Sequence, residues 1–274
     1  MRNVMRRIVP VVALVMLAAG SAFGAHPLIT DDTGTQGRGK FQVEVNGEYG
    51  HDSESELAVR SKENSGSLET VFSAGLIDSV DLVLAVPYEW SRVKENGFVS
   101  ADTDGLGDVS LELKWRFFEK DGFSLAFKPA VSFPSGNTDK GLGAGKVGYG
   151  ATLIATQEFD PFAVHLNLSY SHTPFKLEED KDANRRDIWH ASLAGTAEVM
   201  EGLQLAANVG LETNPDKTSN TPPVFCIAGS IYSVTDWLDV DLGVKVGLTK
   251  PETDVSMLAG VALPSAGTVR LGGL

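Results

Sequence analysis

The most informative pattern in the chain is a strict alternation of aliphatic and polar residues, seen most clearly from Leu238 to Leu248. Every even position in this stretch is aliphatic, and every odd position is charged or is glycine. Successive side chains of a strand point to opposite faces, so one face here is hydrocarbon and the other carries Asp239, Asp241 and Lys245. A barrel that turns such an apolar face outward and a polar face inward is suited to a membrane.

The same pattern recurs along the chain and predicts an all-β fold, a transmembrane antiparallel up-and-down β-barrel of about 12 strands over residues 40–263. Most segments have about ten residues, enough for a tilted strand to cross a bilayer. Two of them, Gly66–Ala74 and Val224–Ser233, alternate poorly. The predicted strands are Lys40–His51, Gly66–Ala74, Val80–Arg92, Asp108–Phe118, Phe123–Phe133, Val147–Phe159, Phe162–His172, Asp187–Val199, Leu203–Glu212, Val224–Ser233, Leu238–Leu248 and Asp254–Leu263.

The connections between these segments alternate in length, which is typical of outer-membrane barrels with tight periplasmic turns and longer external loops. The short ones are Gly75–Ser79, Glu119–Gly122, Asp160–Pro161, Met200–Gly202 and Thr235–Trp237. The long ones are Asp52–Ser65, Val93–Gly107, Pro134–Lys146, Thr173–Arg186, Thr213–Pro223 and Thr249–Thr253. An even number of strands then leaves both ends of the barrel on the periplasmic side.

Aromatic residues gather near the ends of the predicted strands. On the loop side they are Tyr49, Tyr88, Trp90, Tyr170 and Trp189, and on the turn side Phe72, Phe117, Phe159, Phe162, Tyr232 and Trp237. This placement predicts two aromatic girdles where lipid meets water. The alternative is that aromatic residues simply favour strands.

Residues 1–24 have the features of a secretory signal peptide. Arg2, Arg6 and Arg7 precede a short apolar run, and Ala22 and Gly24 supply the small residues of a cleavage site, so cleavage is expected before Ala25. The alternative, an uncleaved anchor, is disfavoured because the run is shorter than the roughly 20 residues of a spanning helix. Residues 25–39 are expected to form a periplasmic N-terminal segment, and residues 264–274 a C-terminal tail, of a protein exported to the bacterial outer membrane.

The charge balance narrows the range of partners. Removal of the three arginines of the signal peptide takes the formal charge of the chain from −13 to −16, which argues against a nucleic acid. The single cysteine, Cys226, lies in a predicted strand and is interpreted as a small apolar filler. We expect no cofactor.

The candidate functional residues are the ionisable side chains that the alternation turns inward. They are Glu44, Glu48, Glu89, Glu112, Lys114, Arg116, Lys128, Glu158, His165, His190, Glu198, Glu212, Asp239, Asp241 and Lys245. In one interpretation, the basic patch of Lys114, Arg116 and Lys128 faces acids across an open pore and creates a transverse field that selects solutes. In the alternative, salt bridges fill a closed lumen and hold its shape.

Catalytic and metal sites are not predicted. His165 and His190 are not cross-strand neighbours, because His190 falls opposite Ser169, and no His, Cys and Asp grouping has metal-ligand spacing. A nucleophile elbow is missing, and the glycines of 141–145 lack the context of a phosphate loop. The acidic run 178–182 is interpreted as a solvated loop tip, or else as a divalent-cation bridge to anionic outer-leaflet lipid.

Several motifs also resemble a known family. The segments ITDDTGTQGRGKFQVEVNGEYG (29–50), VDLVLAVPYEW (80–90), GLGDVSLELKWRFFE (105–119), FPSGNTDKGLGAGKVGYG (133–150) and KPETDVSMLAGVAL (250–263) are similar to a bacterial outer-membrane family named for transport in the meta-pathway of phenol degradation. The resemblance implies a barrel with a transport role. The chain departs from the family pattern in one respect. Members of such barrel families usually end the last strand with an aromatic residue, which the barrel assembly machinery recognises, and here no aromatic residue ends that strand.

The expected function is therefore passive uptake of small solutes through the outer membrane, with aromatic compounds implied by the resemblance. The expected partners are outer-membrane lipid and lipopolysaccharide, a small-molecule solute and the barrel assembly machinery. A closed structural or adhesion barrel that binds partners through its loops is the main alternative. An outer-membrane lipid hydrolase is the third.

Overall fold

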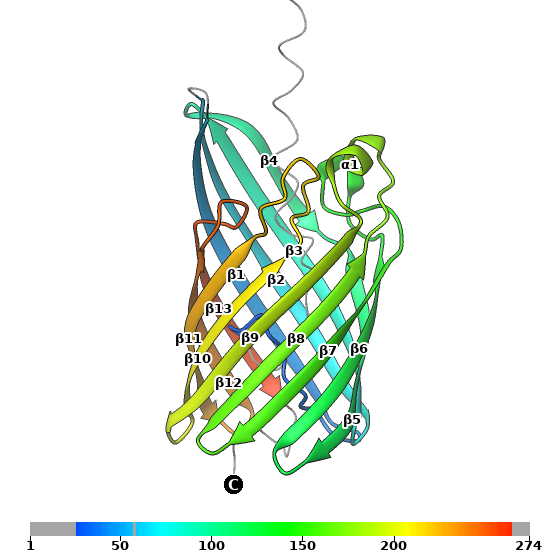
Figure 1. The fold of residues 1–274 in the computed structure, drawn as a ribbon, viewed down its shortest axis with the longest axis vertical. Helices are drawn as coiled ribbons and strands as arrows, with labels where there is room; N and C mark the ends of the chain where they lie inside the picture. The colour runs from blue at the N-terminus through cyan, green and yellow to red at the C-terminus, as the bar shows by residue number, and fades with distance from the viewer. Residues whose placement is uncertain (1–25, 57–58, 265–274) are drawn as a thin grey trace, which may run out of the picture.

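The computed structural model describes residues 26–56 and 59–264, so the predicted signal peptide and the predicted tail from residue 265 onward lie outside the described residues. The chain forms an antiparallel barrel with short turns at one end and longer connections at the other (Figure 1). Its elements are β1 (Phe41–Glu56), β2 (Val59–Ile77), β3 (Val80–Glu95), β4 (Phe98–Leu106), β5 (Val109–Lys120), β6 (Phe123–Phe133), η1 (Thr138–Lys140), β7 (Gly148–Phe159), β8 (Phe162–His172), α1 (Glu178–Ala183), β9 (Asp187–Met200), β10 (Leu203–Glu212), β11 (Val224–Thr235), β12 (Leu238–Gly247) and β13 (Val255–Pro264).

The barrel is closed by the pairing of its first and last strands. β1 pairs with β13 from Gln42 opposite Pro264 to His51 opposite Val255. Strands β4 and β5 share one position in the wall, because β3 pairs with β5 near the turn end and with β4 near the loop end. The thirteen strands thus fill twelve positions, as the alternation predicted, and no sheet edge is left open within the closed wall.

The predicted facing of the strands is confirmed in the side-chain exposure. On β5, Leu111, Leu113 and Trp115 are exposed on the outside, whereas Glu112 and Lys114 are buried in the lumen. Both ends of the outer wall carry exposed aromatic rings, including Trp189 at the loop end and Trp237 at the turn end. Within the described part of the chain, no helix is long and apolar enough to cross a membrane.

A charge on this outer wall should block insertion into a bilayer. Leu166 lies at the middle of β8 and is exposed, so Leu166→Arg should cost about 2–4 kcal/mol of barrel stability in lipid. Val99→Arg is the matched control, since Val99 is also apolar and exposed but lies on β4 close to the Asn96-Gly97 turn, in the part of the hairpin above the rim. The measurement is the yield of heat-modifiable barrel in outer-membrane fractions. Equal yields for the two variants would show that Leu166 does not face lipid.

Two of the long loops predicted from sequence are wrong. Most of Asp52–Ser65 and Val93–Gly107 is strand, because β1 to β4 continue above the rim as paired hairpins. Both faces of these extensions meet water, so their residues carry no alternation of aliphatic and polar types. The dipeptide Asn96-Gly97, with positive φ at both residues, makes the two-residue turn and was the local signal for this hairpin.

The two strands that alternate poorly, β2 and β11, do so because apolar side chains also point inward there. Val71 of β2 is fully buried against Val83 and Ala85 of β3. Phe225 and Ile227 of β11 pack with Leu258 of β13. The lumen therefore has apolar walls as well as polar ones.

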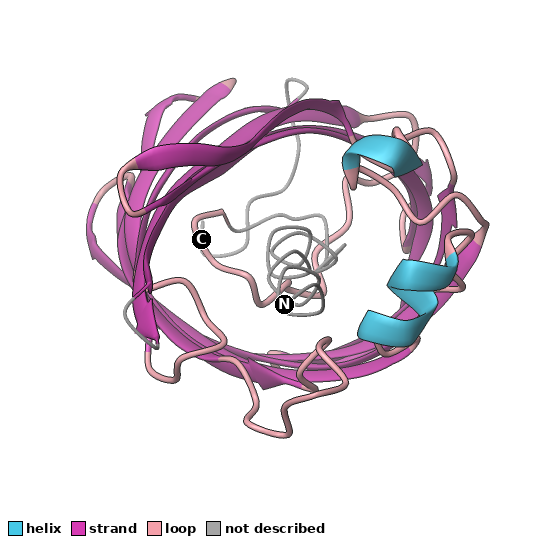
Figure 2. Ribbon diagram, turned by 90° about the horizontal axis from the view of Figure 1, so that it is seen from above, coloured by secondary structure: helices cyan, strands magenta, loops and turns pink. Residues whose placement is uncertain are grey.

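The segment before β1 lies inside the barrel and not in the periplasm, where it was expected. Figure 2 shows the loop that leads into the first strand crossing the interior of the ring. Thr35 donates a hydrogen bond to the Asp78 carbonyl at 2.8 Å, near the turn between β2 and β3, and the chain runs from there into the lumen. The inward-facing polar side chains of the wall supply its hydrogen-bond partners. We call residues 26–36 the plug.

Candidate functional site

The plug is anchored by a buried aspartate that two lysines share. The Asp31 side chain has no exposed surface, and its two oxygens lie 2.9 Å from the Nζ atoms of Lys114 on β5 and Lys128 on β6. Lys128, itself 2% exposed, also lies 3.1 Å from Glu112. Buried charges are stable only when they are paired and hydrogen-bonded, so each member of this cluster depends on the others.

Neighbouring groups complete the anchor. Asp32 lies 3.5 Å from the Lys114 Nζ. Burial, the largest single influence, raises the pKa of Asp32, but the Lys114 ammonium, His165 and the Gly34 N–H together lower it by more, so its pKa lies below the ordinary value. In the amide orientation that satisfies both groups, Asn167 of β8 accepts from the Asp31 N–H at 2.7 Å and donates to the Asp31 carbonyl at 2.9 Å.

On the far side of the lumen, Asn208 of β10 holds the plug by its backbone. Its side-chain oxygen accepts from the N–H groups of Ile29 at 2.8 Å and Thr30 at 3.1 Å. Its amide nitrogen donates to the Thr30 hydroxyl at 2.7 Å. Leu28 packs beside these bonds against Ala194 and Ala206.

The start of the plug rests on β11 and β12. His26 hydrogen-bonds Asp241 of β12 through Nδ1. Pro27 lies against Gly229 and Gly243, and a Cβ added to Gly243 would come within 2.8 Å of the proline ring. The plug therefore contacts the wall from β3 round to β12, and it fills the lumen between these strands.

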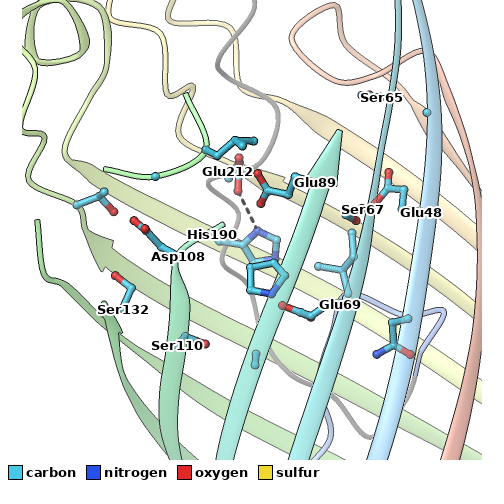
Figure 3. A pocket seen from close by; sticks show the side chains of 18 of the residues that line it. Glu48, Ser65, Ser67, Glu69, Glu89, Asp108, Ser110, Ser132, His190 and Glu212 are labelled. Atoms are coloured by element: carbon cyan, nitrogen blue, oxygen red, sulfur yellow. Dashed lines mark ion pairs between the residues drawn. The ribbon is translucent and has the colours of Figure 1, made fainter. Parts of the chain in front are cut away.

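Above the plug, on the loop side, is a cavity of about 260 Å³. Pro27, Leu28 and Ile29 form its floor, and inward-folded loop residues, among them Leu142 and Phe175, line it from above. Figure 3 shows acidic and hydroxyl side chains reaching into it from neighbouring strands. The carboxyl groups that line it belong to Glu48, Glu69, Glu89, Asp108, Glu112, Asp180, Glu212 and Glu252.

The loops over the cavity are tied down by specific bonds. Asp108, at the junction of β4 and β5, accepts from the backbone N–H groups of Gly136 and Ala144, both at 2.9 Å. Arg185 donates to several carbonyls of the loop 213–223, including those of Asn214 at 2.6 Å and Ser219 at 2.9 Å. The entrance to the cavity is thus built from ordered chain.

The predicted lumen residues fall into three groups by their place in the barrel. Those at the plug are Glu112, Lys114, Lys128, His165 and Asp241, and those at the cavity are Glu48, Glu89, His190, Glu212 and Lys245. The remainder lie elsewhere on the inner wall or near the turn end: Glu44, Arg116, Glu158, Glu198 and Asp239.

Two expected relationships between these residues can be compared with the structure. His190 does lie opposite Ser169, as the strand register predicted. The basic patch does not act as one unit, since Lys114 and Lys128 bind the plug while Arg116 pairs with Glu119 at 3.2 Å. For the two lysines, the structure favours the alternative of salt bridges that fill the lumen.

Three central residues were not among the candidates from sequence. Glu69 lies on β2, whose weak alternation left its facing open, and Glu252 lies in a connection. Asp31 precedes the first strand, and nothing local indicates where its side chain lies. The available signal was indirect: two inward lysines, Lys114 and Lys128, sit close together and need an anion between them.

Comparisons with known proteins agree with this architecture. The model of a family described as "Putative MetA-pathway of phenol degradation" matches residues 26–263. An outer membrane channel from Pseudomonas putida F1 has a similar structure, with a TM-score of 0.67 and 17% identity over 85% of this chain and 98% of that one. The KdgM porin gives a TM-score of 0.53 and 9% identity over 81% and 98% of the two chains.

A third similar structure is the translocator domain of the autotransporter NalP from Neisseria meningitidis. It gives a TM-score of 0.52 and 13% identity over 83% of this chain and 88% of that one. No curated protein sequence matches the chain. At these identities the solved structures bear on the fold, whereas the family match covers nearly the whole described barrel.

Proposed function

This chain belongs to the family described as "Putative MetA-pathway of phenol degradation", and we propose that it is an outer-membrane channel for the passive diffusion of small solutes. The observation that carries the proposal is the polar cavity inside the barrel, with ordered loops at its entrance and the plug as its floor. A purely structural barrel has no need of such a space, because close packing of the lumen would add stability.

In this channel the solute enters from the loop side and meets the cavity first. It then passes the plug, which occupies the turn-side half of the lumen. The plug is the narrowest element of the path and sets the size limit of the solutes. Aromatic compounds, to which the family description points, are one class of solute that fits a cavity with apolar walls.

The surroundings of the channel are part of the same proposal. The exposed apolar wall contacts outer-membrane lipid, and the charged loops meet lipopolysaccharide. The strands are inserted by the barrel assembly machinery. The channel acts by diffusion and has no catalytic step.

Planar-bilayer recording of the refolded mature barrel tests this function. The wild type should give discrete single-channel current steps in KCl. Ser67→Trp, which places a large ring in the cavity, should reduce the step size. Leu68→Trp is the matched control, because the neighbouring side chain faces lipid and its replacement should leave the steps unchanged. A folded wild-type barrel without current steps would favour the closed structural barrel instead.

A further inference from the structure

The carboxyl groups of the cavity are only partly matched by cations. Lys245 lies 2.8 Å from Glu48 and 3.1 Å from Glu252, and Lys128 pairs with Glu112 at 3.1 Å. His190 lies 3.6 Å from Glu212, and Figure 3 marks this pair with a dashed line. Among the described residues that line the cavity, Lys245 is the only lysine or arginine, so the acids there outnumber the fixed positive charges.

Four of these acids, Glu69, Glu89, Asp108 and Asp180, form no salt bridge within the described part of the chain, and two of them, Glu69 and Glu89, lie together. Glu69 of β2 is opposite Pro87 of β3, and Ser67 is opposite Glu89. The register makes Glu69 and Glu89 diagonal neighbours on one face, a relation that places their strand positions about 7 Å apart. Both side chains point into the cavity (Figure 3).

Two serine hydroxyl groups at the same cavity also have no hydrogen-bond partner within the described part of the chain. Ser65 of β2 and Ser110 of β5 line it, and they are 5% and 8% exposed. Neither side chain makes a hydrogen bond to any residue between 26–56 and 59–264. Because both residues line the cavity, their hydroxyl groups are available there to a ligand or a water.

The remaining walls of the cavity are apolar. Phe225 and Leu258 line the β11–β13 side, Leu28 lies in the floor, and Leu142 and Phe175 lie on the loop side. The cavity therefore presents unpaired carboxylates and hydroxyls on the β2, β3 and β5 side and hydrocarbon elsewhere.

We propose that this cavity binds small organic cations that carry one ammonium group on an apolar body, and that it disfavours carboxylates. The inference rests on the proposed function in that it names the class of solute. An ammonium group has three donors and no acceptor, which matches two carboxylates and a hydroxyl. A carboxylate solute meets like charge in a confined space, and this repulsion excludes it.

The test is a matched set of six-carbon probes: hexylammonium, hexanol and hexanoate. Their binding to the refolded barrel is measured by titration calorimetry, which does not depend on conduction. The wild type should bind hexylammonium most tightly and hexanoate most weakly. In the Glu69→Gln/Glu89→Gln variant, affinity for hexylammonium should fall about tenfold or more, because charge-assisted hydrogen bonds are lost.

Glu179→Gln/Glu201→Gln is the control variant, since it removes the same charge from exposed positions outside the cavity and should bind as the wild type does. Equal wild-type binding of hexanoate and hexylammonium would overturn the inference, as would an unchanged affinity in the Glu69→Gln/Glu89→Gln variant. The order of the three probe affinities is measured on the wild type, so the inference can still be tested if the Glu69→Gln/Glu89→Gln variant does not fold. A wild-type barrel that binds hexylammonium but gives no current steps in KCl would instead refute the proposed channel function and leave the inference about the cavity standing.

Discussion

Deletion of residues 27–34 is expected to raise the single-channel conductance severalfold. These residues include the floor of the cavity and the Asp31 anchor, and they contact the wall on opposite sides of the lumen. Ion flow through a narrow path is limited by its smallest section, so the plug rather than the barrel diameter sets the conductance. Planar-bilayer recording in KCl gives the measurement.

Replacement of the same eight residues by glycine and serine separates the effect of chain length on the conductance from the effect of the contacts that the plug makes. Without Leu28 and Asp31 the segment loses its packing and its ion pairs, so this variant should also conduct more than the wild type, with noisier open levels. Wild-type conductance in both variants would mean that the plug does not limit the flow. The barrel wall should survive either change, because its strand pairing is continuous without the plug.

Asp31→Ala is expected to release the plug while the barrel stays folded. The change removes the carboxylate that lies 2.9 Å from both lysines, so Lys114 keeps only Asp32 at 3.5 Å and Lys128 keeps only Glu112 at 3.1 Å. Removal of one partner from a buried ion pair costs about 3–5 kcal/mol. The variant lowers its free energy most easily when water enters around the lysines and the plug leaves its binding position. Limited proteolysis of the refolded barrel should then cleave near the N-terminal end much faster than in the wild type.

The control for this variant is Asp121→Asn, because asparagine removes the charge and tolerates the positive φ of this position. Asp121 lies in a turn, is 87% exposed, and stands 4.0 Å from Lys120, so its loss should be close to neutral. Equal cleavage rates for Asp31→Ala and the wild type would show that the ion pairs do not hold the plug.

Much of the wall could be predicted from sequence because the pleat of a strand is a local property. Alternation at residues such as Leu238 to Leu248 decides which side chains face lipid, and a slip by one residue would place charges in hydrocarbon. The turn at Asp121 and Gly122, both with positive φ, is equally local. The strands of the hairpin above the rim were not predicted, because both of their faces meet water and their sequence therefore does not alternate. The dipeptide Asn96-Gly97 nevertheless marks the turn of this hairpin.

The interior depended on tertiary structure. Strand alternation determined which residues point inward, including Lys114, Lys128 and Glu112, but not what each one meets there. The bonds from Asp31 to the two lysines join positions 83 and 97 residues apart. Such partners come together because closure of the barrel brings distant strands around one lumen. Their pairing is favoured because a buried charge without a partner costs free energy. Sequence by itself determined the wall and its two faces, whereas only the closed barrel decided that the chain's own N-terminal segment fills it.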